Sequence, residues 1–331
     1  MLRYLAQRLA YAVATIFAVS VIVYLIFSLL PFDPAALTCG TKCTPEIVKN
    51  NRIQLGLDKP LIEQYWLFLS GIFVGRDYGV GQAAFSCPAP AFGYSFNNNM
   101  CVTEMITEAL PITVQLALGA MVIWLTVGIG LGIVAAKFRG KIPDTASSIF
   151  VLLGTSLPTF VTGIALIVWV SIKWELIPPS LDGYVSFFDD PKAYFYYFIL
   201  AWITLAIAYA AFYTRFTRAS VLEVMGEDYI RTARAKGLKE RTVLMKHTMR
   251  AVLAPLVTSA GLDFAGLMGG AIITESLFNL PGLGRLTLRS ISQYDLSVIV
   301  ATVLLAAVIV IVMNLIVDLL YGVLDPRVRV K

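Results

Sequence analysis

The stretch EDYIRTARAKGLKERTVLMKHTMR, residues 227 to 250, is the longest polar and basic interval between strongly apolar segments in the second half of the chain. Glu227 and Asp228 place negative charge where a helix would start, and positive side chains follow toward its end. Gly237 then supplies a residue that readily adopts the left-handed conformation that stops a helix. The pattern predicts a short helix with defined ends between two apolar segments.

The composition of the whole chain indicates that this stretch lies outside a lipid bilayer. Of the 331 residues, 58% are hydrophobic and only 14% are charged, which excludes an ordinary soluble domain. Lipid offers no hydrogen-bond partners to the backbone, so segments of about 20 residues that span it must be helical. We therefore expect an all-α integral membrane protein, in which the net charge of +5 is no sign of a nucleic-acid partner.

Six apolar segments are long enough to cross a membrane as helices. They cover residues 9–30, 112–136, 146–172, 194–212, 255–277 and 297–320. The first is expected to remain as an anchor, because its apolar core exceeds the roughly 7 to 15 residues of a signal peptide. Gly128, Gly130 and Gly132 would let another helix approach the second segment closely, and Pro158 predicts a kink in the third.

All four cysteines fall in the polar segment between the first two spans. This confinement indicates an oxidising compartment, where each disulfide would add about 2 to 4 kcal/mol of stability. Three pairings are open; we favour sequence neighbours, Cys39 with Cys43 and Cys87 with Cys101. A zinc site is the alternative, but the segment lacks histidine and its spacing matches no finger pattern, so no metal is expected.

The distribution of positive charge gives the orientation of the spans. Counting the termini, the connection after the second span and the interval from Arg215 to Arg250, 17 of the 26 Lys and Arg lie on one side. The positive-inside rule makes that side cytoplasmic. Both termini are then cytoplasmic, and the cysteine segment lies outside, in agreement with the redox argument.

Several motifs resemble those of one family of membrane proteins. DYIRTARAKGL (228–238), LGLDKP (55–60), MGGAIITESLFNLPGLGRL (268–286) and NLIVDLLYGVLDPR (314–327) are similar to stretches of ABC importer permeases of the dipeptide/oligopeptide family, specifically the first permease subunit. The resemblance covers the chain from end to end and implies a type I importer permease fold. The cysteine segment departs from it, because residues 81–100 look longer than the family pattern.

The resemblance divides the chain into three regions. Residues 1–30 form the N-terminal tail and first helix, 31–108 the extracytoplasmic segment, and 109–331 the permease core. Within the core, residues 217–254 would be a cytoplasmic coupling loop that docks on an ATPase subunit. The residues assigned to this contact are Glu227, Asp228, Tyr229, Arg231, Thr232, Ala233, Arg234, Ala235, Lys236 and Gly237. A basic loop bound to anionic lipid headgroups is the alternative.

The chain carries no phosphate-binding P-loop pattern, so ATP and Mg²⁺ are expected in partner chains and no catalysis in this one. The partners implied by the resemblance are a second homologous permease, two ATPase subunits and an extracytoplasmic peptide-binding protein in a bacterial inner membrane. Peptide is the expected substrate, with nickel or another small solute as the alternative. An ion-coupled secondary transporter is a different class, which should show several intramembrane charges and an internal repeat.

Three residues are candidates for the translocation path. Asp263, in the middle of the fifth span, should face the protein interior, because a charge facing lipid there would cost about 2.5 to 3.5 kcal/mol. It could meet the amino group of a peptide or pair with a polar group of another helix. Met268 and Glu275 follow in the same segment. His247, the only histidine, cannot form a metal site or a catalytic triad alone.

Overall fold

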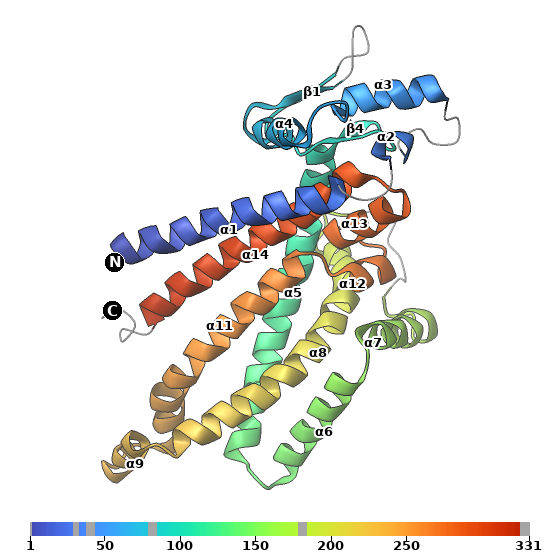
Figure 1. Ribbon diagram of the computed structural model, residues 1–331. Helices are drawn as coiled ribbons and strands as arrows, with labels where there is room; N and C mark the ends of the chain where they lie inside the picture. The colour runs from blue at the N-terminus through green and yellow to red at the C-terminus, as the bar shows by residue number, and fades with distance from the viewer. Residues whose placement is uncertain (1, 29–32, 38–43, 79–84, 178–183, 325–331) are drawn as a thin grey trace. The chain divides into compact units, whose positions relative to one another are not determined.

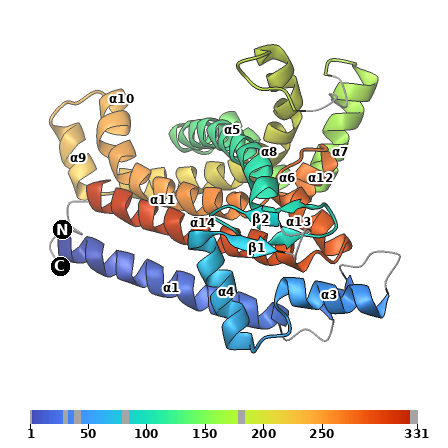
Figure 2. The same ribbon diagram turned by 90° about the horizontal axis from the view of Figure 1, so that it is seen from above.

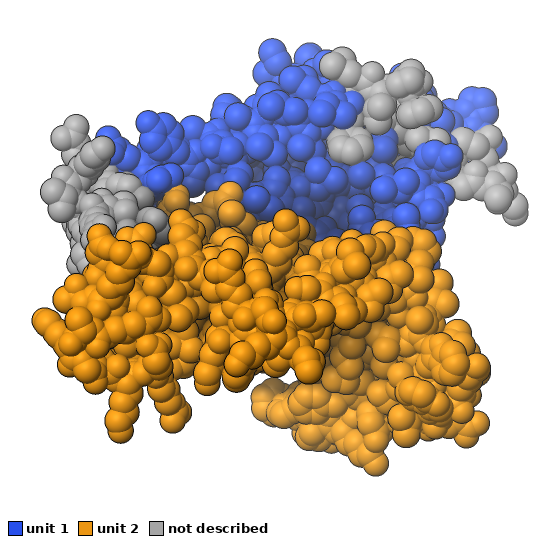
Figure 3. Space-filling view, turned by 90° about the horizontal axis from the view of Figure 1, so that it is seen from below, with its two compact units in different colours: residues 1–113, 268–272, 281–312 blue, residues 114–267, 273–280, 313–331 orange. Residues whose placement is uncertain are grey.

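The structure is a computed structural model that describes residues 2–28, 33–37, 44–78, 85–177 and 184–324. The chain divides into two compact units (Figure 3). Unit 1 comprises residues 1–113, 268–272 and 281–312, and unit 2 comprises residues 114–267, 273–280 and 313–331. The cysteine segment belongs to unit 1, and the stretch 227–250 belongs to unit 2.

Helices dominate the described residues (Figure 1). They are α1 (Leu2–Ser28), α2 (Pro34–Leu37), α3 (Pro45–Leu55), α4 (Leu61–Val74), α5 (Val102–Lys137), α6 (Ile142–Ser156), α7 (Thr159–Leu166), the π-helix η2 (Ile167–Lys173), α8 (Pro191–Met225), α9 (Asp228–Ala235), α10 (Glu240–Thr242), the π-helix η3 (Val243–Thr248), α11 (Met249–Met268), α12 (Ile272–Leu277), α13 (Leu283–Ser292) and α14 (Leu296–Leu324). Two small antiparallel sheets pair β1 (Arg76–Tyr78) with β2 (Phe85–Cys87) and β3 (Tyr94–Ser95) with β4 (Met100–Cys101).

Five stretches of the described residues are long and apolar enough to cross a membrane as single helices. They are Ala6–Ile26, Val102–Lys137, Pro191–Met225, Glu240–Met268 and Leu296–Leu319. The pair formed by α6 and α7–η2 makes a sixth if it is counted as one broken span. The expected all-α membrane fold is confirmed, with two corrections to the predicted segments.

The first correction concerns the third segment, which is broken rather than kinked. Its two halves meet at an angle of 104°. Leu157 ends α6 in an extended conformation and Pro158 precedes α7. A proline disfavours helical geometry in the residue before it and cannot donate a hydrogen bond, so the helix stops where the sequence suggested only a bend.

The second correction concerns the fifth segment, in which α11 ends at Met268 instead of running to Leu277. Gly270 has a φ of +109°. A Cβ atom at this position would lie 2.6 Å from the Cα atom of Gly284, at the start of α13. The chain therefore turns at a glycine that permits both the backbone conformation and the close approach, and α12 is a separate short helix.

Close helix packing in unit 2 uses two of the three glycines singled out in α5. A Cβ atom on Gly128 would lie 2.6 Å from Tyr213 Cβ, and one on Gly132 would lie 2.5 Å from Thr217 Cβ. A Cβ atom on Gly130 would meet nothing within 4 Å. The prediction of close approach is thus confirmed for Gly128 and Gly132, which bring α5 against α8, and it is wrong for Gly130.

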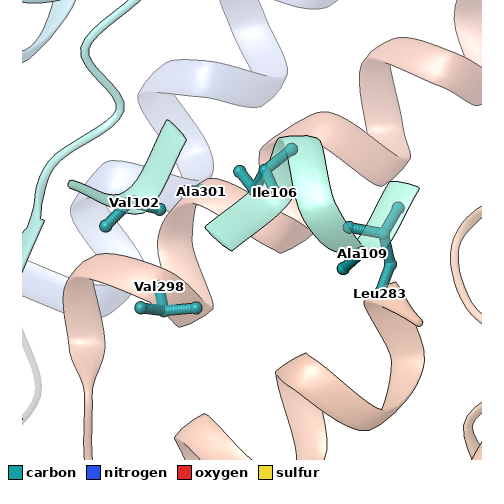
Figure 4. Packing of buried hydrophobic residues seen from close by; sticks show 6 residues of the cluster. All are labelled: Val102, Ile106, Ala109, Leu283, Val298 and Ala301. Atoms are coloured by element: carbon teal, nitrogen blue, oxygen red, sulfur yellow. The ribbon is translucent and has the colours of Figure 1, made fainter. Parts of the chain in front are cut away.

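Unit 1 is held together by an apolar cluster that joins α5, α13 and α14. The buried side chains are Val102, Ile106, Ala109, Leu283, Val298 and Ala301 (Figure 4). The amide of Leu283 also donates to the Thr113 hydroxyl at 2.8 Å. The packed ends of these helices therefore form a base for the cysteine segment.

The small sheets of the cysteine segment are fastened to this base. A disulfide joins Cys87 to Cys101, as we favoured from the sequence, whereas the expected Cys39–Cys43 pair lies outside the described residues. The Ser95 hydroxyl donates to Asp295, just before α14, and the Asn97 side chain donates to the Gln293 carbonyl at 3.0 Å. Burial raises the pKa of Asp295, and its hydrogen bonds with Ser95 and the Val298 amide oppose that shift.

Candidate coupling site

Helix α9 begins and ends where the charge pattern predicts. Glu227 precedes the helix in an extended conformation, and Asp228 lies in its first turn. At the other end, the Lys236 amide donates to the Thr232 carbonyl at 3.1 Å and the Gly237 amide donates to the Arg234 carbonyl at 2.9 Å. Gly237 has a φ of +76°, so the predicted left-handed stop is confirmed.

One face of α9 is fixed to the adjoining parts of the same loop. Ile230 and Ala233 pack against Val243 at the start of η3, and Val224 in the last turn of α8 contacts this cluster. Ile230 and Val243 are fully buried. Figure 1 shows α9 beyond the end of α8, and Figure 2 shows it next to α10. Helix α9 is therefore packed against α8 and against the helical stretch Glu240–Met268, and it does not lie in a flexible loop.

The opposite face of α9 is open and charged. Its exposed residues are Glu227, Asp228, Tyr229, Arg231, Thr232, Ala235, Lys236 and Gly237. Of the two alanines assigned to docking, Ala233 is buried in the cluster with Ile230 and Val243, and only Ala235 lies on this face. The Arg231–Asp228 pair, at 3.5 Å and largely exposed, contributes little stability. Burial and the charge of Glu227 raise the pKa of Tyr229, which is still 47% exposed.

The turn after α9 is closed by an ion pair. Arg234 Nε lies 2.7 Å from Glu240 Oε1, which links the end of α9 to α10. The chain then continues through η3, where Thr248 Oγ1 donates to the Val243 carbonyl at 3.2 Å, and into α11. His247 lies partly buried in η3. Together α10, η3 and α11 form the helical stretch Glu240–Met268, which is long and apolar enough to cross a membrane, so α9 lies next to the start of a candidate span.

The candidate path residues are placed as follows. Tyr213 of α8 donates its hydroxyl proton to Asp263 Oδ2 of α11 at 2.7 Å, so Asp263 pairs with another helix. The Trp124 ring stacks near both Tyr209 and Tyr213, with centroid distances of 4.6 and 6.5 Å. Met268 and Glu275 are buried, in α11 and α12. Asp263 and Glu275 belong to unit 2, and Met268 belongs to unit 1.

A further ion pair in unit 2 could not be found from the sequence. Arg218 Nε and Nη2 donate to the two carboxylate oxygens of Asp144 at 2.6 and 2.9 Å. The Gly140 amide also donates to Asp144 Oδ2 at 2.9 Å. The pair joins the first turn of α6 to α8. The only available signal was that the acidic Asp144 follows the basic residues between 137 and 141. Its partner, Arg218, is 74 residues away in the chain.

Known proteins that resemble this chain are transport permeases. The glutathione transport system permease protein GsiC of Shigella boydii serotype 4 (strain Sb227) and that of Escherichia coli (strain K12) are each 37% identical over 332 residues, covering 100% of both chains. A Brucella abortus (strain 2308) protein with the provisional name of peptide transport system permease is 37% identical over 326 residues, covering 98% of each chain.

Comparisons of structure and of family models agree with these relatives. A chain of the MetNI methionine ABC transporter, in an inward-facing conformation, matches 67% of this chain and 97% of its own length with a TM-score of 0.54 and 18% identity, which confirms the permease fold. Residues 1–117 match the N-terminal model of binding-protein-dependent transport system membrane components, and residues 128–330 match the model of the inner membrane component. The chain therefore belongs to the family of binding-protein-dependent transport system inner membrane components.

Proposed function

We propose that this chain is a permease subunit of an ATP-driven ABC importer and forms half of a translocation path for peptides. It pairs with a second homologous permease, two ATPase subunits and an extracytoplasmic peptide-binding protein. ATP and Mg²⁺ bind to the ATPase subunits, and this chain performs no hydrolysis itself.

The observation that supports this proposal most directly is the packing of α9 against the adjoining helices. Its charged face is open to a partner, while Ile230 and Ala233 tie it to α8 and to the helix that runs to Met268. A loop that bound only lipid headgroups would not need a buried core of its own. The Asp228 and Lys236 side chains suit charge-assisted contacts with a protein cleft.

The proposed orientation places both termini and α9 in the cytoplasm of a bacterial cell. Arg218 lies near the carboxyl end of α8, and its pair with Asp144 brings the basic α5–α6 turn to the same end of unit 2 as α9. The two most basic connections thus share one side, as the positive-inside rule requires. The outer disulfide supports an oxidising compartment for the opposite side.

Peptide is the substrate class that the relatives favour. Relatives that align over the full length of the chain carry glutathione or peptide transport in their names, and glutathione is itself a tripeptide. Mass spectrometry of ligands carried by the cognate binding protein, purified without refolding, tests this assignment. Recovery of nickel or another small solute in place of peptides would contradict it.

The coupling role is tested with two matched glycines. Gly237 and Gly140 both have a φ of +76°, and a Cβ atom would meet nothing within 4 Å at either. Valine at either position would therefore cost a similar backbone strain of roughly 1 to 2 kcal/mol. Gly237→Val should abolish substrate-stimulated ATPase activity of the assembled complex, while Gly140→Val should retain it.

Membrane insertion and complex assembly should be the same for both variants. Unchanged stimulation in Gly237→Val, or an equal loss in Gly140→Val, would refute the assignment of α9 as the coupling element.

A further inference from the structure

Helix α4 carries an exposed apolar face that the importer function does not explain. Ile62, Trp66 and Phe73 are 85%, 66% and 76% exposed. Their spacings of four and seven residues place them on one side of the helix. The only charged side chain in this 14-residue helix is Glu63, which forms a 2.8 Å ion pair with Lys59 before its start. A water-facing helix would not present such a stripe.

The other face of α4 packs against the span α1. The hydroxyl of Tyr65 lies 2.8 Å from Ser20 Oγ, and the Tyr24 hydroxyl donates to the Gln64 side chain at 3.3 Å. Ring contacts join Tyr24 to Phe68, with centroids 5.8 Å apart. Figure 2 shows α4 crossing α1. The contact occurs within the apolar stretch Ala6–Ile26, and not beyond its end.

The contact with Ser20 fixes the depth of α4. Ser20 lies six residues before Ile26, which corresponds to about 9 Å along the helix at 1.5 Å per residue. Half the hydrocarbon core of a bilayer is about 15 Å thick. The side of α1 around this contact is also open, since Phe17, Ile22 and Ile26 are 55%, 54% and 56% exposed. Helix α4 therefore lies at the level of lipid acyl chains, beside an exposed apolar surface of α1.

We propose that α4 is an interfacial helix and that Ile62, Trp66 and Phe73 bind the acyl chains and headgroup boundary of the leaflet around the carboxyl end of α1. The apolar surface of α4 continues the exposed apolar surface of α1, and Trp66 is a residue type enriched at membrane interfaces. That leaflet is the outer one if the orientation proposed above is correct; the lipid contact itself does not depend on the orientation.

The anchored helix holds the disulfide-bonded sheets of the outer segment. The Ala91 amide donates to the Gly71 carbonyl at 3.1 Å. At the end of α4, Gly75 has a φ of +87°, and a Cβ atom there would lie 2.9 Å from the Cys87 carbonyl oxygen. These backbone contacts leave little room for movement between α4 and the sheets. The lipid contact would therefore fix the outer segment at a set height on the membrane.

Site-specific photo-crosslinking of the complete complex in nanodiscs of phosphatidylethanolamine and phosphatidylglycerol tests the proposal. The photoreactive residue p-benzoylphenylalanine replaces Phe73 or Ile62 in the stripe, and Lys49, an exposed residue of the polar helix α3, serves as the control. Because an interfacial helix buries its apolar face, lipid adducts at the stripe should exceed those at Lys49 by about tenfold or more in mass spectra of the digested chain.

Two outcomes would overturn the proposal. Adducts between the stripe and another protein subunit would show that a protein covers α4. Equal lipid adduct at Phe73 and Lys49 would show that the stripe has no preference for the bilayer. The readout does not use transport or ATP hydrolysis, so failure here is distinguishable from failure of the coupling role of α9.

Discussion

Substitution of Gly132 in α5 provides a direct test of the helix packing that surrounds the coupling site. In Gly132→Ala, the new methyl group would lie 2.5 Å from Thr217 Cβ and 2.8 Å from the Thr214 carbonyl oxygen. Ordinary carbon contacts are about 3.5 to 4.0 Å, so α5 and α8 must separate by about 1 Å. The obstacle includes α8 backbone, which cannot rotate away as a long side chain would.

The expected change in stability on substitution follows from two opposed effects. Alanine in a helix is more stable than glycine by roughly 0.5 to 1 kcal/mol. Overpacking a close contact costs about 1 to 3 kcal/mol. Gly130→Ala, two residues away in the same helix, gains the first effect without the second, because a Cβ atom at Gly130 meets nothing within 4 Å. Gly132→Ala should therefore be less stable than Gly130→Ala by about 1 to 3 kcal/mol.

Thermal unfolding of the purified complex, followed by loss of the monodisperse peak in size-exclusion chromatography, measures this difference. At about 2 to 4 °C per kcal/mol, the value for units of roughly 150 to 250 residues, Gly132→Ala should melt roughly 2 to 12 °C below Gly130→Ala. Gly130→Ala should match or exceed the parent protein. Equal melting temperatures for the two variants would refute the claim that α5 and α8 touch through Gly132.

Three further changes test the packing of α9 and the stability of the cysteine segment. Ile230→Ala should cost about 2 to 5 kcal/mol of local stability and speed hydrogen exchange of the α9 amides, whereas the exposed Tyr229→Ala should leave that exchange unchanged. Loss of the 14-residue disulfide loop in Cys101→Ser should cost about 3 kcal/mol and make the outer segment sensitive to protease, and resistance equal to that of the parent would contradict this. Because the folded-state pKa of Asp295 is raised, the folded protein holds its proton more tightly than the unfolded chain, so stability should fall as pH rises above about 4. Asp295→Asn should show a smaller fall in melting temperature between pH 4 and 7, and an identical fall would exclude this contribution.

Features that depend on local chemistry could be predicted from the sequence. The ends of α9 follow from Asp228 and Gly237, because helix ends are decided by charge and by backbone conformations within a few residues. The spans in α1, α5, α8 and α14 follow from length and hydropathy. The pairing of Cys87 with Cys101 follows from their proximity in the chain, which makes closing the loop inexpensive in entropy.

Features that depend on tertiary contacts could not be predicted from the sequence. Pro158 indicated a bend, but no feature of the sequence predicts the 104° angle between the two halves. Gly128, Gly130 and Gly132 look equivalent in sequence, and only the position of α8 separates the two that are in contact from the one that is not. Ala233 appeared suited to docking, yet the helical spacing from Ile230 turns it toward Val243.

The contacts of α8 indicate how movement of α9 would spread through unit 2. Helix α8 ends one short turn before α9 and makes three kinds of contact within residues 213–218. Thr217 lies against Gly132 of α5, Arg218 pairs with Asp144 of α6, and Tyr213 bonds to Asp263 of α11. Tight backbone packing and charge-assisted hydrogen bonds resist sliding more than apolar contacts between flexible side chains do. We therefore expect α8 to carry these neighbours with it as a block, so that motion at the coupling site displaces several spans together.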